Sequence, residues 1–349
     1  MCSSLVGGQP DSSHQPLCIV GAGSLGQTFA AMLARSGQLV TLLSTPATAA
    51  RLLDSGFIRI RGAERLDVPV ARPPAAAGTV AITDDPADLP ADVGLLFTTK
   101  AHHLASAATA VRAAWPRSGD DTSWVAGLQN GLYKDDVLAE AFGTDRVVGA
   151  VTITSAERRE NGEILFTSPG VSYLGSFDPR QAGRVHVATS MLHEAGLPAE
   201  PTADIRSVLW TKACNAAGIF GVSLLTRVAG AGLLASEARA RAYVSLIKET
   251  AEIGQAEGVE TADLPRFPPI RTYVDQPADE SVRALVTARA AADGALAPTP
   301  SMLQDLFAGR GLEVEEVFGD LVRRSQRSGV SAPRLEVVTE LLRGVDPLR

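Results

Sequence analysis

The sequence predicts an α/β domain followed by an all-helical domain. In the first half of the 349-residue chain, short apolar runs without alternation recur between helical segments, a pattern typical of strands buried on both faces. A glycine-rich turn directly follows the first of these runs. After about Asp204 the apolar spacing is helical almost to the C-terminus, with breaks at Pro265–Pro269 and Pro298–Pro300. We therefore expect a flexible leader over residues 1–16, an α/β domain over 17–195 and a helical domain over 196–349.

The first unit has the form strand, turn, helix, strand. Leu17–Val20 is the first strand, Gln27–Arg35 has the spacing of a helix, and Leu39–Leu43 is the second strand. The intervening turn has the pattern GxGxxG, in which the first glycine allows the tight turn, the second admits a pyrophosphate and the third lets helix and strand pack closely. A glycine turn alone is a weak signal, but here both flanking elements are present. We predict a Rossmann-type dinucleotide site formed by Gly21, Ala22, Gly23, Ser24, Leu25 and Gly26.

The residues after the second strand bear on which dinucleotide binds. NAD sites usually have an acid there, which bonds the ribose 2′-hydroxyl. This chain has Ser44-Thr45-Pro46 and no acid before Asp54, which favours NADP. It has no arginine at this point either, and Arg51 lies further along.

Two polar residues follow later strands. Lys100 ends the run Val93–Thr99 and precedes a predicted helix over Ala101–Ala114, and Asn130 follows the run Trp124–Leu128. Ligands of open parallel sheets bind beyond the carboxyl ends of the strands, so both residues are candidate ligand contacts, although each could equally be a solvated cap or turn residue. Further short strands are expected at Val147–Thr154, Ile164–Phe166 and Val171–Leu174.

In the helical part, Lys212 and Asn215 lie in an otherwise apolar helix that continues to Arg227. A lysine there is either an edge residue or a buried functional amine. Ser301 with Gln304 has the spacing of a capping box, and a capped helix N-terminus also suits a substrate carboxylate. Glu313 begins an acidic helix start.

Composition narrows the class of protein. Hydrophobic residues make up 45%, charged residues 20%, and the net charge of −7 gives no basic field for nucleic acid. The three cysteines are far apart, so neither a disulfide framework nor a metal site is predicted. No apolar run approaches the length of a membrane span, and the N-terminus lacks the features of a secretion signal, which favours a cytoplasmic protein.

Lysine is rare in this chain. Of 32 basic residues only four are lysines. A guanidinium cannot give up its proton at usable pH, so lysine is expected where a titratable ammonium matters. The alternative is that the positions of the four lysines are accidental. The four are Lys100, Lys134, Lys212 and Lys248.

Taken together, these residues resemble the ketopantoate reductase family of NADPH-dependent 2-dehydropantoate 2-reductases, which act in pantothenate biosynthesis. The resemblance spans about residues 17–343. Its generic part is the GxGxxG unit. Its specific parts are Lys100, Leu128-Gln129-Asn130-Gly131, Trp210-Thr211-Lys212, Ser301-Met302-Leu303-Gln304-Asp305, Glu313 and Gly319.

The resemblance implies reduction of the keto group of a 2-oxo acid, without a metal. It implies Lys212 as the catalytic proton donor and Glu313 as the acid that holds the substrate and that lysine. Asn130, Asn215 and Ser301 are the implied or inferred substrate contacts, and Lys100 and Asn130 are implied beside the nicotinamide. A homodimer is a further expectation.

The chain departs from the family pattern near Lys212. The family has asparagines four and eight positions after the lysine, where this chain has Ala216 and Phe220, and Asn215 compensates only in part. Thr45 replaces the family's arginine, and Leu312 replaces its threonine before the glutamate. Ketopantoate therefore leads as substrate, with three alternatives: a bulkier 2-oxo acid in a more apolar pocket, an imine in an opine-type reaction, and NADP binding without turnover.

Overall fold

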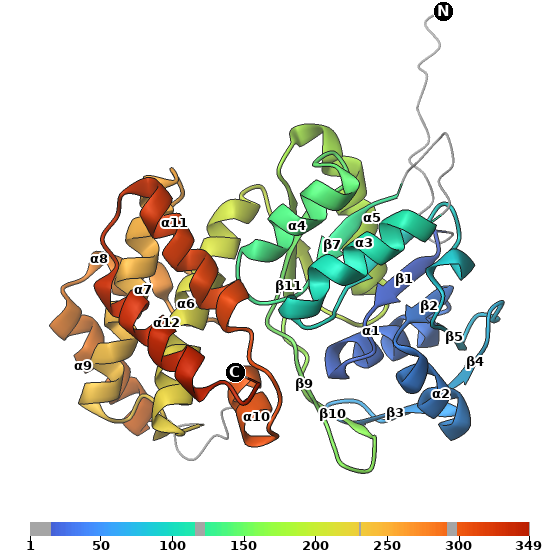
Figure 1. Cartoon of the computed structure of the whole chain (residues 1–349), viewed down its shortest axis with the longest axis horizontal. Coiled ribbons are helices and arrows are strands. Elements are labelled where there is room, and N and C mark those ends of the chain that lie inside the picture. Colours follow the sequence, from blue (N-terminus) through green and yellow to red (C-terminus); the bar gives the residue numbers. More distant parts are fainter. Residues whose placement is uncertain (1–14, 116–122, 230–231, 292–298, 349) are drawn as a thin grey trace, which may run out of the picture.

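The computed structural model describes residues 15–115, 123–229, 232–291 and 299–348. A sheet-containing N-terminal half and a helical C-terminal half lie side by side (Figure 1). The predicted leader falls almost entirely outside the described residues, as do Cys2 and Pro298.

The main sheet has nine strands in the order β7-β6-β1-β2-β5-β4-β3-β10-β9. From β7 to β4 neighbouring strands pair in parallel, whereas β3 runs antiparallel to β4 and β9 runs antiparallel to β10. The strands are β1 (Leu17–Val20), β2 (Val40–Leu43), β3 (Phe57–Gly62), β4 (Leu66–Ala71), β5 (Val80–Thr83), β6 (Gly94–Phe97), β7 (Val125–Gly127), β9 (Ser155–Arg158) and β10 (Ile164–Ser168).

Helices cover both faces of the parallel strands. Leu17 and Ile19 of β1 pack in the core that contains α1, whereas Cys18 and Val20 pack in the core that contains α3 and α4. Burial on both faces explains why β1 is apolar at every position. The helices of this half are α1 (Ser24–Arg35), α2 (Pro46–Ser55), α3 (Leu104–Ala114), α4 (Tyr133–Phe142) and α5 (Ala182–Glu194), with short 3₁₀ turns η2 (Pro86–Asp88), η3 (Ala101–His103) and η4 (Pro179–Gln181).

A second, three-stranded sheet lies beside the main one. It has the order β12-β11-β8, with β11 parallel to β12 and antiparallel to β8. The strands are β8 (Val148–Thr152), β11 (Ser172–Ser176) and β12 (Ala199–Pro201). The chain then enters the helical half.

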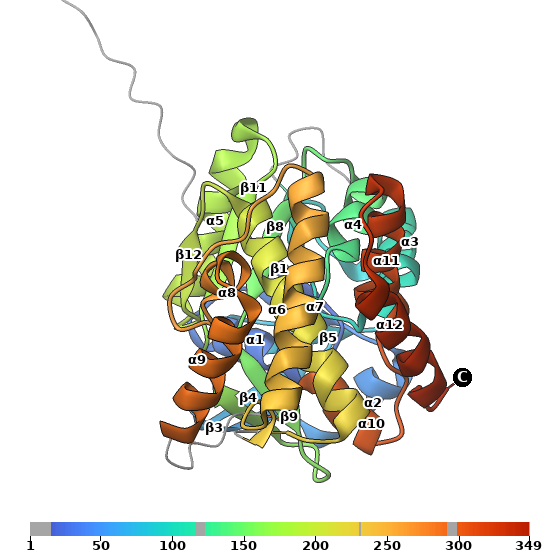
Figure 2. The same ribbon diagram turned by 90° about the vertical axis from the view of Figure 1, so that its left-hand side faces the viewer.

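The helical half is built around α6 (Ile205–Thr226) and α7 (Glu237–Ala256), which pack along each other (Figure 2). Contrary to the sequence analysis, α6 is long and apolar enough to cross a membrane by length and composition, but 78% of its most apolar window is buried inside the protein. That burial is typical of the core helix of a soluble domain. The other elements are α8 (Ile270–Asp275), α9 (Ala278–Ala291), α10 (Ser301–Phe307), the π-helical turn η6 (Glu315–Gly319), α11 (Asp320–Ser328) and α12 (Pro333–Val345).

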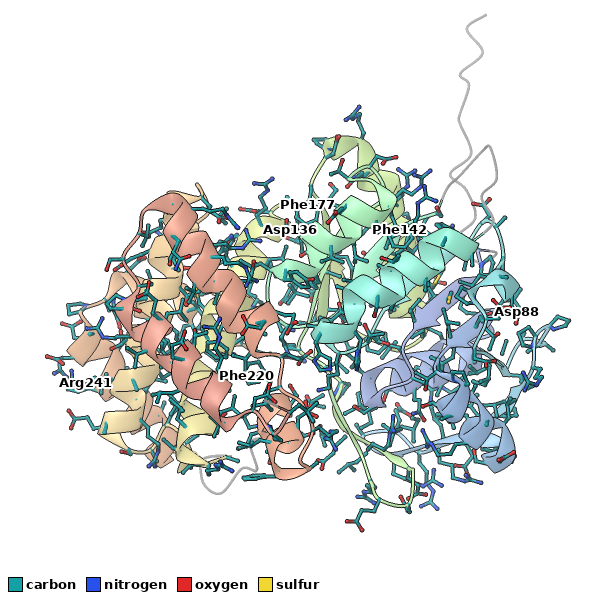
Figure 3. The ribbon with its side chains drawn as sticks, viewed as in Figure 1. Asp88, Asp136, Phe142, Phe177, Phe220 and Arg241 are labelled. Carbon is teal, nitrogen blue, oxygen red and sulfur yellow. The ribbon has the colours of Figure 1, made fainter. Side chains whose placement is uncertain are left out.

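Side chains join the two halves. Asp136 of α4, labelled in Figure 3, forms an ion pair with Arg324 of α11, which also bonds Asp320 on its own helix. Phe177 packs against apolar residues of both halves. The halves therefore enclose a fixed space between them.

Candidate functional site

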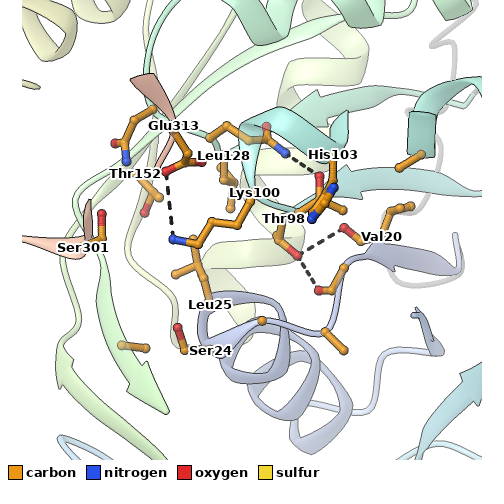
Figure 4. A pocket seen from close by; sticks show the side chains of 18 of the residues that line it. Val20, Ser24, Leu25, Thr98, Lys100, His103, Leu128, Thr152, Ser301 and Glu313 are labelled. Carbon is orange, nitrogen blue, oxygen red and sulfur yellow. Dashed lines mark hydrogen bonds and ion pairs between the residues drawn. The ribbon is translucent and has the colours of Figure 1, made fainter. Parts of the chain in front are cut away.

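A cavity of about 940 Å³ lies between the two halves. It is lined by Gly21–Leu25 after β1, the residues after β2, β6 and β7, the strand β9, the face of α6 that carries Lys212, and the start of α10. It contains all but one of the site residues predicted from the sequence, because Gly26 lies behind the turn. Figure 4 shows Lys100 extending across this space towards Glu313.

The glycine turn has the geometry that its sequence predicts. Gly21 has φ +111°, and a β-carbon on Gly26 would lie 2.0 Å from the Gly21 carbonyl oxygen, so helix and strand approach closely only with glycine at position 26. At Gly23 the nearest atom to such a β-carbon is 3.8 Å away, which leaves room for a ligand. The first turn of α1 contains no acid and no side chain caps it, so its N–H groups can bind a pyrophosphate. The turn therefore fits a dinucleotide.

Hydroxyl groups line the cavity beyond β2. Ser44, Thr45 and Thr48 face it, and the Thr45 hydroxyl donates to that of Thr48 at 3.2 Å. Thr45 is the N-cap residue of α2, whose first turn contains no acid. As the sequence predicts, this region has neither the acid of an NAD site nor an arginine directly after the strand.

Lys100 is held by carboxylates of the helical half. The Lys100 ammonium donates to the buried Asp305 and lies 4.0 Å from the Glu313 carboxylate. Asp305 also accepts from Arg310 at 2.8 Å. Glu313 is itself buried and accepts from the Ala101 N–H at 2.7 Å. These contacts fix Lys100 at the rim of the sheet. The sequence motif Ser301–Asp305 contains Asp305 but predicts no role for it, because its partner Lys100 lies in a distant part of the chain.

Lys212 differs from the other three lysines. Lys134 pairs with Asp135, Lys248 donates to the carbonyls of Val274 and Gln276, and Lys100 pairs with Asp305. Within the described residues, Lys212 has no hydrogen bond or ion pair, yet it lines the cavity. Burial lowers its pKa to about 8, the Lys134 ammonium also lowers it, and Glu313 opposes this shift.

Two asparagines lie near this lysine. Asn215 lines the cavity one turn along α6, and its Oδ1 accepts from the Tyr243 hydroxyl at 2.7 Å, which orients the amide. Asn130 lines the cavity after β7. Both are placed to contact a ligand.

The departures from the family pattern have unequal consequences. Ile219, Phe220 and Phe267 line the same cavity as Lys212. Ala216 is buried and is not one of the lining residues, because its side chain ends at the β-carbon. Phe220 therefore adds an apolar ring to the wall, whereas Ala216 leaves the wall without the family's amide at that position.

The predicted capping box is wrong. Pro300, not Ser301, is the N-cap residue of α10, and Ser301 is the first residue of the helix without a capping bond. Gln304 donates instead to the Thr299 carbonyl at 2.8 Å. Because the helix begins at Ser301, its N-cap residue is Pro300, which offers neither the side-chain oxygen nor the N–H that a capping box needs. The hydroxyl of Ser301 is therefore free of that structural role, and Ser301 lines the cavity.

Comparison with known proteins identifies relatives over nearly the whole chain. Residues 17–179 match the family model described as ketopantoate reductase PanE/ApbA, and residues 204–346 match the model of its C-terminal part. The 2-dehydropantoate 2-reductase of Archaeoglobus fulgidus is 26% identical over 332 residues, covering 95% of this chain and 98% of the relative. The enzyme of the same name from Halobacterium salinarum is 27% identical, covering 93% and 97%.

Solved structures share the fold. The 2-dehydropantoate 2-reductase of Geobacter metallireducens superposes with a TM-score of 0.76 at 24% identity, covering 94% of this chain and 99% of that one. A D-mandelate dehydrogenase in complex with NADH and anilino(oxo)acetate superposes with a TM-score of 0.75 at 19% identity, covering 94% and 98%. These likenesses confirm the α/β domain followed by helices.

Proposed function

The chain belongs to the ketopantoate reductase family, and on that premise we propose that it reduces the keto group of a 2-oxo acid to a hydroxyl with NADPH, Lys212 acting as the general acid. Relatives named 2-dehydropantoate 2-reductase align with at least 93% of the chain, which supports this reaction class. The glycine turn and the open start of α1 would hold the pyrophosphate. The nicotinamide, when bound, supplies the hydride.

The proposal rests chiefly on Lys212, which lines the cavity and has no hydrogen bond or ion pair within the described residues. Reduction of a carbonyl builds negative charge on its oxygen, and a positioned ammonium both stabilises that charge and supplies the proton. A pKa of about 8 leaves the amine protonated at neutral pH but able to give up its proton. Within the described residues no side chain pairs with the Lys212 ammonium, so the ammonium is available to a substrate oxygen.

The remaining residues would position the acid. Asn215, oriented by Tyr243, would donate its amide N–H to the substrate. Ser301, whose hydroxyl has no capping bond, would bind the carboxylate. Glu313 would orient the substrate and keep Lys212 charged through its negative field. Lys100 and Asn130 would lie beside the nicotinamide and the substrate.

The cavity wall favours one substrate class within this reaction. Phe220, Ile219 and Phe267 give the cavity that Lys212 lines an apolar side, where the family pattern has a polar amide at the position of Phe220. A site without a hydrogen-bond partner for a substrate hydroxyl selects poorly for that hydroxyl. We therefore propose a 2-oxo acid with a bulkier apolar side chain as the second candidate beside ketopantoate.

The absorbance of the nicotinamide tests both candidates. NADPH and NADH would each be mixed with the protein and with ketopantoate, then with a series of bulkier 2-oxo acids. We expect oxidation of NADPH with at least one acid. Turnover of ketopantoate alone would place the protein in pantothenate biosynthesis, and turnover of a bulkier acid alone would support a changed pocket. Binding of NADPH without oxidation by any oxo acid would contradict the reductase proposal and favour the imine reaction or a non-catalytic sensor.

We also propose that the protein acts on small molecules in the cytoplasm. The net charge of −7 does not favour nucleic acid or an anionic membrane surface. The homodimer and the domain boundary at residue 195 stay predictions.

A further inference from the structure

The recognition of the extra phosphate of NADPH has no assigned residue in this chain. A 2′-phosphate needs a cation or several N–H donors, and the position directly after β2 holds the neutral Thr45. A cation for this group must therefore come from elsewhere in the fold.

Arg158 reaches this region from β9. It lines the cavity, and its Nη2 donates to the Ala22 carbonyl at 2.8 Å, within the glycine turn itself. The strand brings it there because β9 packs along α1. That single bond occupies one of the five N–H donors of a guanidinium, and no carboxylate pairs with Arg158 among the described residues.

Arg51 is exposed on α2, outside the residues that line the cavity, and approaches the hairpin that carries Arg158. It lies on α2, whose N-terminus carries Thr45 and Thr48, and its Nη1 would lie 3.9 Å from a β-carbon placed on Gly162 in the turn between β9 and β10. The helix α2 and the β9–β10 hairpin are therefore neighbours. Arg51 also has no ion pair in the part of the chain that the structure describes.

Arg158 is repelled by the charges of Arg51 and Arg310. Burial lowers the pKa of Arg158, and the nearby charges of Arg51 and Arg310 lower it further. Arg310 pairs with Asp305, whereas Arg51 and Arg158 have no carboxylate partner among the residues that the structure describes. Like charges gathered at the edge of a cavity are stabilised by a bound anion.

We propose that Arg158 and Arg51 bind the 2′-phosphate of NADPH together with the Thr45 and Thr48 hydroxyls, replacing the arginine that is missing after β2. This inference rests on the proposed function only in its choice of cofactor. It assigns the preference for NADPH over NADH to a hairpin and a helix distant in sequence from the glycine turn.

One residue of the cavity opposes this assignment. Asp84, directly after β5, also lines the cavity, and a carboxylate favours a ribose hydroxyl over a phosphate. If Asp84 governed the choice, NADH would bind more tightly than NADPH. The two assignments therefore predict opposite preferences.

Direct binding measurements on the full chain test the proposal without turnover. Calorimetry or nicotinamide fluorescence would give the Kd of NADPH and NADH for the unmodified protein and for Arg158→Met and Arg51→Met. Arg159→Met is the matched control, since Arg159 follows Arg158 on the same hairpin but, unlike Arg158, does not line the cavity. Charge-assisted hydrogen bonds to a phosphate are strong enough that each loss should weaken NADPH binding about tenfold or more. NADH binding should stay within about twofold. Displacement of NADPH by 2′,5′-ADP but weakly by 5′-AMP would locate the effect at the 2′-phosphate.

The alternatives give different results. An equal loss for NADPH and NADH in Arg158→Met would mean that Arg158 binds the pyrophosphate or only holds the glycine turn, and would overturn the proposal. Unchanged affinities in both variants, or tighter binding of NADH than of NADPH by the unmodified protein, would overturn it as well. If the variants behave as expected but no oxo acid is reduced, the phosphate assignment stands and the proposed reaction fails.

Discussion

The two sides of the cavity are built in different ways. On the sheet side the ligand space is shaped by backbone, since Gly21, Gly23 and Gly26 act through the absence of a side chain. On the helical side it is shaped by a few side chains, above all Lys212, Asn215 and Phe220 of α6. The first side would hold a group common to many enzymes, and the second would hold the group that distinguishes this one.

This difference determines which amino-acid substitutions each side of the cavity tolerates. Gly26 tolerates no side chain, because a β-carbon there would lie 2.0 Å from the Gly21 carbonyl oxygen and would force the backbone to move. A side-chain wall can change in chemistry while the fold persists, as Phe220 illustrates. Substitutions on the two sides should therefore fail in different ways.

Lys212→Met should give the largest loss of activity with the smallest loss of fold. Removal of a general acid lowers kcat by about 10² to 10⁴-fold. The Kd of NADPH should stay unchanged and the melting temperature should not fall, because methionine fills a similar volume and removes an unpaired ammonium whose charge is disfavoured by burial. Lys248→Met, which removes a lysine outside the cavity, is the control and should retain kcat.

The pH profile distinguishes the proton donor from a merely structural lysine. A general acid must be protonated, so kcat/KM for reduction should fall about tenfold per pH unit above the pKa of Lys212, which is about 8. In Lys212→Met this limb should disappear from the residual activity. A limb that survives in the variant would assign the proton to another group.

Apolar patterning predicts elements in both halves of the protein, and its misses have a physical reason. The strand β1 and the end of α6 lie where the apolar pattern places them, because burial on one or both faces leaves a periodic trace. The strands β3, β4 and β9 were not predicted, since they are partly exposed and alternate only briefly. Helix α1 begins at Ser24 instead of Gln27, and the segment predicted as one helix from Ala101 begins with the 3₁₀ turn η3.

The site residues show the same limit. The strand ends indicate Lys100 and Asn130, and the family resemblance implies Lys212, Ser301 and Glu313. All five line one cavity. The sequence did not indicate that Asp305 holds Lys100 or that Arg158 reaches the glycine turn, because those contacts span 205 and 136 positions. The unpaired state of Lys212 also depends on the positions of carboxylates that no local pattern fixes.

Gly26→Ala and Gly23→Ala sharpen the steric half of the comparison. At Gly26 the added β-carbon meets the Gly21 carbonyl and the Thr98 hydroxyl, so we expect a loss of about 1–3 kcal/mol in the free energy of unfolding together with weaker NADPH binding. At Gly23 the backbone has φ −69° and ψ −175°, which alanine adopts freely, and the space is open. Gly23→Ala should therefore keep its stability and lose only cofactor affinity. Chemical denaturation with a parallel Kd measurement checks both, and equal stability of the two variants would refute the steric account.

Phe220→Asn tests whether the helical side sets the substrate class, with a smaller expected effect. Phe220 is 7% exposed, so an asparagine there loses packing and some stability, whereas Phe220→Leu keeps the wall apolar. We expect the ratio of kcat/KM for a bulky apolar 2-oxo acid to that for ketopantoate to fall about tenfold in Phe220→Asn and to change little in Phe220→Leu. Because both substrates are measured on the same preparation, a reduced folded fraction cancels from the ratio. An unchanged ratio in Phe220→Asn would mean that Ile219, Phe267 or the sheet side selects the substrate, and the division of roles between the two sides would then be wrong.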